Sequence, residues 1–163
     1  GDGDIQINNG SSIGAGIKFV TANDFTLSGG TSLTNSVEVY ALGAVTVTND
    51  LTVPIGSTLY SKSSADGAIS TGGSVNANCV APYGQVYMNY GAIRGLIYAD
   101  RLRTANSGEI RGGIIVGQSS SIQGSIQIYY DATYLPAGLL GLGGTGDVSA
   151  EAGLSISDWQ EVY

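Results

Sequence analysis

A spacing of 20 residues between apolar positions constrains this chain more than any other feature of its sequence. Around these positions apolar and polar residues alternate, as in Ile5-Gln6-Ile7, and turn-forming residues such as Asn8-Asn9-Gly10 lie between them. Four sets of residues recur at this step: Ile5, Phe25 and Val45; Ile7, Leu27 and Val47; Ile13, Leu33 and Val53; Val20, Tyr40 and Tyr60. Short alternating strands at a constant repeat predict a β-solenoid in which each repeat forms one coil.

A second, shorter repeat follows in the other half of the chain. Residues 93–99 read IRGLIYA and residues 110–116 read IRGGIIV, a step of 17, and residues 122–128 read IQGSIQI after a step of only 12. We expect the isoleucines to point inward and the glycines to lie at corners that a side chain would obstruct. The short last step predicts a trimmed final coil. The residues to which we assign this structural role are Ile93, Gly95, Ile97, Ile110, Gly112, Ile114, Ile122, Gly124 and Ile126.

These repeats predict an all-β chain that forms a single right-handed parallel β-solenoid (β-helix) with coils of about 17–20 residues. Its 163 residues, 26 of them glycine and 12% of them charged, fit one ordered domain. We expect the solenoid to span residues 1–134, with a loop inserted at about 61–68. Residues 135–163 break the pattern and are expected to form a link and a capping strand or tail. Trp159 would be its anchor or an interface residue.

The sequence offers little for catalysis. It contains no histidine, which removes histidine-based nucleophilic catalysis and histidine zinc sites, and its one cysteine, Cys79, is expected to be a buried structural thiol. Carboxylate catalysis stays open, because β-helix enzymes use acidic clusters, but here the acids are scattered. Asp2 and Asp4 are weak candidates for a metal site, with a solvated terminal turn as the alternative. We expect no cofactor and no enzymatic activity.

Four of the six basic residues lie in one stretch, with Tyr98 among them: Arg94, Arg101, Arg103 and Arg111. One interpretation is an external salt ladder that includes Asp100 and Glu109. The other is a small basic strip that binds an anionic ligand, such as a glycan carboxylate or a phosphate backbone. The formal net charge of −7 makes nucleic acid an unlikely partner.

A resemblance adds to these patterns. GQVYMN, AIRGLIYA, EIRGGIIVG, SIQGSIQIYYD and LPAGL, between Gly84 and about Leu139, resemble the solenoid C-terminal domain of minor-pilin-like proteins of bacterial type IV pili. The ending DWQEVY is similar to the Trp-x-Glu element near the end of those proteins. Their N-terminal hydrophobic helix has no counterpart here. Bactofilin-like polymer-forming proteins share the short-coil pattern.

The resemblance implies a non-enzymatic structural or adhesive domain that is extracellular or exposed on the cell surface. Its partners would be other pilus or envelope subunits, with a surface glycan as a further candidate. The sequence contains no run of 18 apolar residues of the kind that predicts a transmembrane segment. We expect this chain to be a fragment of a longer secreted or anchored protein. The alternatives are a self-assembling scaffold like the bactofilins and a carbohydrate-active β-helix protein.

Overall fold

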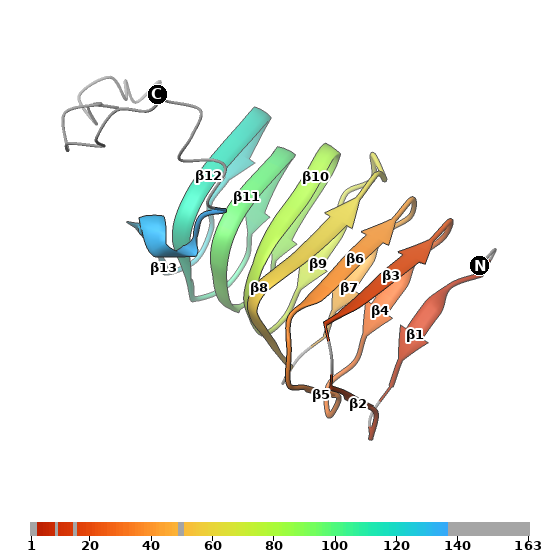
Figure 1. The fold of residues 1–163 in the computed structure, drawn as a ribbon. Helices are drawn as coiled ribbons and strands as arrows, with labels where there is room; N and C mark the ends of the chain where they lie inside the picture. The colour runs from red at the N-terminus through yellow and green to blue at the C-terminus, as the bar shows by residue number, and fades with distance from the viewer. Residues whose placement is uncertain (1–2, 9, 15, 49–50, 137–163) are drawn as a thin grey trace, which may run out of the picture.

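The computed structural model describes residues 3–8, 10–14, 16–48 and 51–136, and these form a parallel β-solenoid of about seven turns (Figure 1). The predicted all-β solenoid is thus confirmed, while its right-handed sense stays a prediction. The elements are β1 (Ile5–Ile7), β2 (Ser12–Ile13), β3 (Ile17–Thr21), β4 (Phe25–Leu27), β5 (Ser32–Leu33), β6 (Val37–Ala41), β7 (Val45–Val47), β8 (Thr52–Ser61), β9 (Ile69–Thr71), β10 (Ser74–Met88), β11 (Gly91–Thr104), β12 (Gly108–Ser121), β13 (Ile126–Tyr130) and the 3-10 turn η1 (Ala132–Tyr134).

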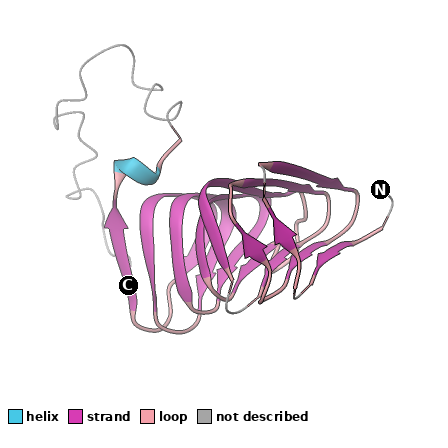
Figure 2. Cartoon of the chain, turned by 60° about the horizontal axis from the view of Figure 1, so that its bottom comes forward, coloured by secondary structure: helices cyan, strands magenta, loops and turns pink. Residues whose placement is uncertain are grey.

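Each coil has three sides, and every strand pair on them is parallel (Figure 2). Side 1 consists of β2, β5, the first residues of β8, β10, β11 and β12, and β13. Side 2 consists of β3, β6, the end of β8 and the middle of β10, β11 and β12. Side 3 consists of β1, β4, β7, β9 and the ends of β10, β11 and β12.

Inward-pointing apolar side chains stack in columns along these sides. Because neighbouring coils are in register, each side chain packs on its counterpart one coil away, about 4.8 Å distant. The buried columns are Val53, Val75, Ile93 and Ile110 on side 1; Val39, Leu59, Cys79 and Ile97 on side 2; and Phe25, Val45, Ile69, Val86 and Leu102 on side 3. Cys79 is buried as expected, and burial raises the pKa of its thiol to about 12.

The two sequence spacings correspond to strand pairing. At the step of 20, Ile5 pairs with Phe25 and Phe25 with Val45. At the step of 17, Ile93 pairs with Ile110, and the arginine, glycine and second isoleucine of the motif pair in the same way. Alternation and repeat length therefore predicted the register of these coils.

Glycine forms the corner between sides 1 and 2 in the second half. Gly95 has a φ of 155° and Gly112 a φ of 137°, values that favour glycine. A Cβ atom at Gly95 would overlap the carbonyl of Ala77, and one at Gly112 would overlap the carbonyl of Gly95. These two glycines thus lie at obstructed corners, as the sequence predicted.

The predicted register of the last repeat is wrong. Ile110 pairs with Ile128, 18 residues later, whereas Ile122 precedes β13 and is 42% exposed. The last coil is therefore not trimmed. Ile126 still packs against the core, and Gly124 has a φ of 83° at a turn pressed on the backbone of Asn106. Alternation cannot distinguish steps of 12 and 18, because both preserve which residues point inward.

After β13 the chain turns back over side 2. The Asp131 carboxylate accepts hydrogen bonds from the Thr133 backbone N–H, at 3.1 Å, and from its hydroxyl, at 2.6 Å, which begins η1. Leu135 then lies over Gly113, close enough that a Cβ there would be 2.9 Å from its Cδ2. The predicted capping residue Trp159 lies outside the described residues. Within the described ranges, no helix is long and apolar enough to cross a membrane.

Candidate functional site

The four arginines of the predicted basic strip lie on two different sides of the solenoid. Arg94 pairs with Arg111 on side 1, whereas Arg101 and Arg103 belong to side 3, and Tyr98 points outward from side 2. The structure therefore does not bring these five residues together in one strip. The chain turns at the glycine corner and again at the register shift between Ala99 and Arg101, so residues close in sequence face different directions.

On side 1, Glu109 lies between the two stacked arginines. Its carboxylate accepts hydrogen bonds from Arg94 Nε at 3.1 Å and from Arg111 Nη2 at 3.2 Å. The hydrogen bond from Arg111, followed by the charges of both arginines and the bond from Arg94, lowers the pKa of Glu109. Arg94 also donates to Asn76 Oδ1 at 3.3 Å, and Arg111 Nη1 is 3.9 Å from Asp131. The shared carboxylate offsets the like-charge repulsion, so this pair forms the salt ladder that was one interpretation of the sequence.

Arg101 holds the segment between β8 and β9. Its guanidinium donates to the Asp66 carboxylate and to the carbonyl of Ser64, at 3.0 Å, and it lies 3.6 Å from Asp100. Residues 62–68 link the two strands without regular secondary structure. Arg101 therefore anchors a loop with its charge neutralised.

Arg103 differs from the other three arginines. In the described part of the chain it has no carboxylate partner, and its guanidinium carbon lies 5.7 Å from the centre of the Tyr87 ring. Arg103 is exposed and pairs directly with Tyr87, which in turn pairs with Ser70. Among the described residues, it is the candidate arginine whose charge no carboxylate neutralises.

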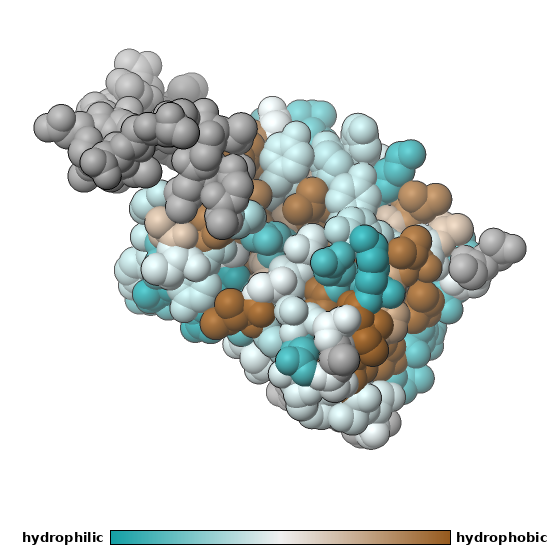
Figure 3. Space-filling model, in the orientation of Figure 1, coloured by the Kyte–Doolittle hydropathy of each residue, from teal (hydrophilic) through white to brown (hydrophobic). Residues whose placement is uncertain are grey.

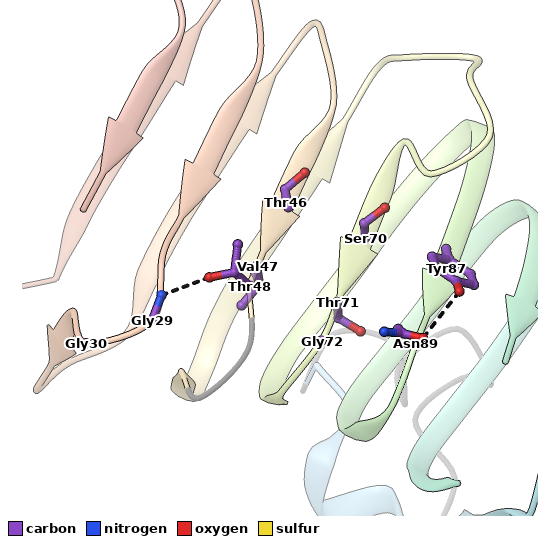
Figure 4. Close-up of a pocket in the computed structure, with 10 residues that line it drawn as sticks. All are labelled: Gly29, Gly30, Thr46, Val47, Thr48, Ser70, Thr71, Gly72, Tyr87 and Asn89. Carbon is purple, nitrogen blue, oxygen red and sulfur yellow. Dashed lines mark hydrogen bonds between the residues drawn. The ribbon is translucent and has the colours of Figure 1, made fainter. Parts of the chain in front are cut away.

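A shallow trough of about 740 Å³ runs along side 3 (Figure 4). Tyr87, which lines it, pairs with Arg103 on the next coil. The outward side chains of Thr46, Ser70 and Tyr87 lie side by side on neighbouring strands. Other lining residues are Gly29, Gly30, Val47, Thr48, Thr71, Gly72 and Asn89. We did not predict this trough from the sequence. One signal for it was present in the sequence: a threonine recurs at the step of 20 between the paired apolar positions, as Thr26 and then Thr46.

Hydrogen bonds fix one edge of the side-3 trough. Thr48 Oγ1 accepts from the Gly29 backbone N–H at 2.8 Å. Asn89 Oδ1 accepts from the Asn106 amide at 2.9 Å and from the Tyr87 hydroxyl at 3.4 Å. The Thr71 hydroxyl is buried at the trough without a hydrogen-bond partner among the described residues. The edge is therefore ordered before any ligand arrives.

Side 2 carries a different surface, an outward column that we call the apolar stripe. It consists of Val20, Tyr40, Tyr60, Val80, Tyr98 and Ile115. Val20 is 59% exposed, Ile115 45% and Tyr98 43%. The Tyr40 and Tyr60 ring centres are 5.9 Å apart. Figure 3 shows apolar patches among polar ones on the face turned toward the viewer.

Of the two weak metal-site candidates, Asp2 and Asp4, the structure describes Asp4. Asp4 Oδ1 accepts from the backbone N–H of Asp24 at 3.3 Å, and Asp24 Oδ1 accepts from that of Ala44 at 2.7 Å. These carboxylates connect coils, and the described residues contain no group of three potential metal ligands. Asp2 lies outside the described residues.

Comparison with known protein families, curated protein sequences and solved structures finds no match to this chain.

Proposed function

We propose that this chain is a non-enzymatic structural and adhesive domain at a bacterial cell surface, similar in role to a minor-pilin-like subunit. The observation that carries the proposal is the apolar stripe of side 2. It extends over six coils, roughly 24 Å at the usual strand spacing. Val20, Tyr98 and Ile115 of this column are exposed and Tyr40, Tyr60 and Val80 are half-buried. A column of apolar and aromatic side chains at the surface marks a candidate interaction site. The partner that we propose for it is another pilus or envelope subunit.

The order of the stripe supports docking of a protein. Lys18 lies 4.5 Å above the Tyr40 ring and 3.4 Å from Glu38, so an exposed ion pair flanks the stripe and contacts one of its tyrosine rings. Ordered aromatic side chains lose little entropy on binding, and they dominate the energetics of many interfaces. Tyr98 and Ile115 extend the stripe toward the turn of the chain at η1.

The state of the carboxylates supports a non-enzymatic role. The pKa of Glu109 is lowered by its arginine partners, and that of Asp131 is lowered by its hydrogen bonds with Thr133 and then by the charge of Arg111. A general acid requires the opposite shift, toward neutral pH. Asp66 and Asp100 are both paired with Arg101. These acids thus fit structural roles.

Site-specific photocrosslinking in cells that carry the full-length protein tests this proposal. A photoreactive residue in place of Tyr98 or Val20 should yield adducts with another envelope or pilus subunit. The matched control places it at Thr46 on side 3, where we expect no such adduct. A protein that stays in the cytosol, or equal adducts from both sides, would overturn the proposal.

A self-assembling scaffold is the second candidate, and the strand edges favour it. Among the described residues, β1 and β3 pair with strands on one flank only, and residues 113–121 of β12 lie beyond the part that pairs with β13. Exposed edges are templates for pairing with another chain. Ile17, on β3, is 39% exposed. Concentration-dependent filaments of the purified chain that Ile17→Lys abolishes would favour this candidate; a monomer at all concentrations would exclude it.

A further inference from the structure

We propose that the side-3 trough binds an acidic polysaccharide, with sugar rings along Thr46, Ser70 and Tyr87 and an acidic group on Arg103. The inference rests on the proposed adhesive function and names the class of ligand for it. It concerns a different side of the solenoid from the apolar stripe, so the two surfaces are separable by experiment.

The spacing of the trough suits a polymer that runs along the solenoid axis. Thr46 pairs with Ser70, Ser70 with Tyr87 and Tyr87 with Arg103, each on the next coil. Neighbouring coils are about 4.8 Å apart, which is close to the length of one pyranose unit. A glycan chain in this direction therefore meets one polar or aromatic side chain per sugar.

The chemistry of the lining suits sugar hydroxyls. Hydroxyl groups both donate and accept hydrogen bonds, as sugar hydroxyls do. The Ser70 hydroxyl donates to the carbonyl of Gly67 at 3.3 Å, which leaves its oxygen free to accept. Gly29, Gly30 and Gly72 contribute no side chain, so the surface stays low there. A shallow floor of glycines and hydroxyl-bearing side chains beside an aromatic ring thus replaces the deep apolar pocket that a small apolar ligand requires.

Charge selects an acidic glycan over a neutral one. Arg103 has no carboxylate partner among the described residues, and its neighbours in the outward column, from Thr26 to Tyr87 and at Ser121, are uncharged. A guanidinium binds a carboxylate through two parallel hydrogen bonds. The net charge of −7 repels polyanions at long range, so binding depends on this local arrangement.

Binding of the purified chain to alginate oligosaccharides, measured by isothermal titration calorimetry, tests the inference. Dextran oligosaccharides of equal length serve as the neutral probe and should bind more weakly. Arg103→Ala removes a charged hydrogen-bonding group and should reduce affinity for alginate about tenfold. Tyr87→Ala should also reduce it. Because Arg103 is exposed, we expect its variant to fold, and circular dichroism checks this.

The matched controls are Lys18→Ala and Tyr98→Ala, which remove an exposed cation and an exposed tyrosine from side 2. They should leave alginate affinity unchanged. Absence of alginate binding, equal binding of alginate and dextran, or equal losses in the side-2 controls would overturn the inference. None of these results affects photocrosslinking from side 2, so failure of the trough and failure of the proposed surface function are distinguishable.

Discussion

In the first coils short strands of two to five residues are separated at every corner, whereas β10, β11 and β12 each continue for 14 or 15 residues around the corners of a coil. Side chains close several corners of the first coils: Asp24 Oδ1 accepts a hydrogen bond from the backbone N–H of Ala44 on the next coil, and the Thr34 hydroxyl donates to the carbonyl of Gly14 at 3.1 Å. The later coils use glycine columns, in which one backbone packs directly on the next.

Corners of the same solenoid therefore differ in how well they tolerate an added side chain. A Cβ at Gly16, in the first half, would meet its nearest neighbour at 3.6 Å, an ordinary contact, whereas one at Gly112 would overlap backbone. Ionic partners differ too, because the first half has the exposed pair of Lys18 and Glu38 while the second has the ladder on Glu109. Substitutions can separate these contributions.

The largest expected effect is at a glycine corner. Gly112→Val adds a branched side chain at a positive φ and against the Gly95 carbonyl, so we expect a loss of about 4 kcal/mol in the free energy of unfolding. Urea unfolding followed by circular dichroism measures it. The matched change Gly16→Val should cost about 1 kcal/mol or less. Equal losses would show that the corners do not differ.

Substitutions in the core should lower the free energy of unfolding by similar amounts in the two halves. Leu27 and Ile97 are both fully buried, so Leu27→Ala and Ile97→Ala should each cost about 3 kcal/mol through lost burial and cavity formation. The same urea experiment compares them. A loss at Leu27 several-fold smaller than that at Ile97 would mean that the first coils are loosely packed.

A smaller effect is expected at the salt ladder. Glu109→Gln should lower stability at pH 7 by about 1 kcal/mol or less, because the pair is partly exposed. Since the pKa of Glu109 is lowered from its ordinary value of 4.5, its contribution is complete above that pH and lost as the pH falls through the lowered value. Unfolding curves at pH 7 and at successively lower pH should therefore converge for the native chain and the variant. A constant difference down to pH 2 would contradict the ladder.

The smallest effect is expected at the exposed ion pair of the first half. Glu38→Gln should change stability by a few tenths of a kcal/mol, since both side chains are more than half exposed and solvent screens them. Thermal unfolding at low and high salt measures this. A loss larger than that of Glu109→Gln would reverse the proposed order of the two halves.

The sequence predicted the solenoid because paired positions recur at steps of 20 and 17, and the step is what the stack requires. It did not predict the register of Ile122, since alternation is the same after any even offset. It also placed Arg94 and Arg103 in one basic strip. The two arginines lie on different sides because the chain bends between them, and residue types alone indicate such bends only in part. The side-3 trough was missed because polar residues that point outward look like ordinary solvent-exposed positions.

Both proposed surfaces depend on the in-register stack of coils, and a disulfide cross-link between neighbouring coils tests this register. Thr46 pairs with Ser70 on the next coil, and the loop of residues 62–68 lies between them in the sequence. If the step of 20 continued through this loop, Thr46 would instead pair with Asp66. Cys79 is buried with a pKa of about 12, so introduced surface thiols should react first. Under mild oxidation, Thr46→Cys with Ser70→Cys should form a disulfide, and Thr46→Cys with Asp66→Cys should not. Cross-linking of the second pair alone, or of neither, would contradict the stack.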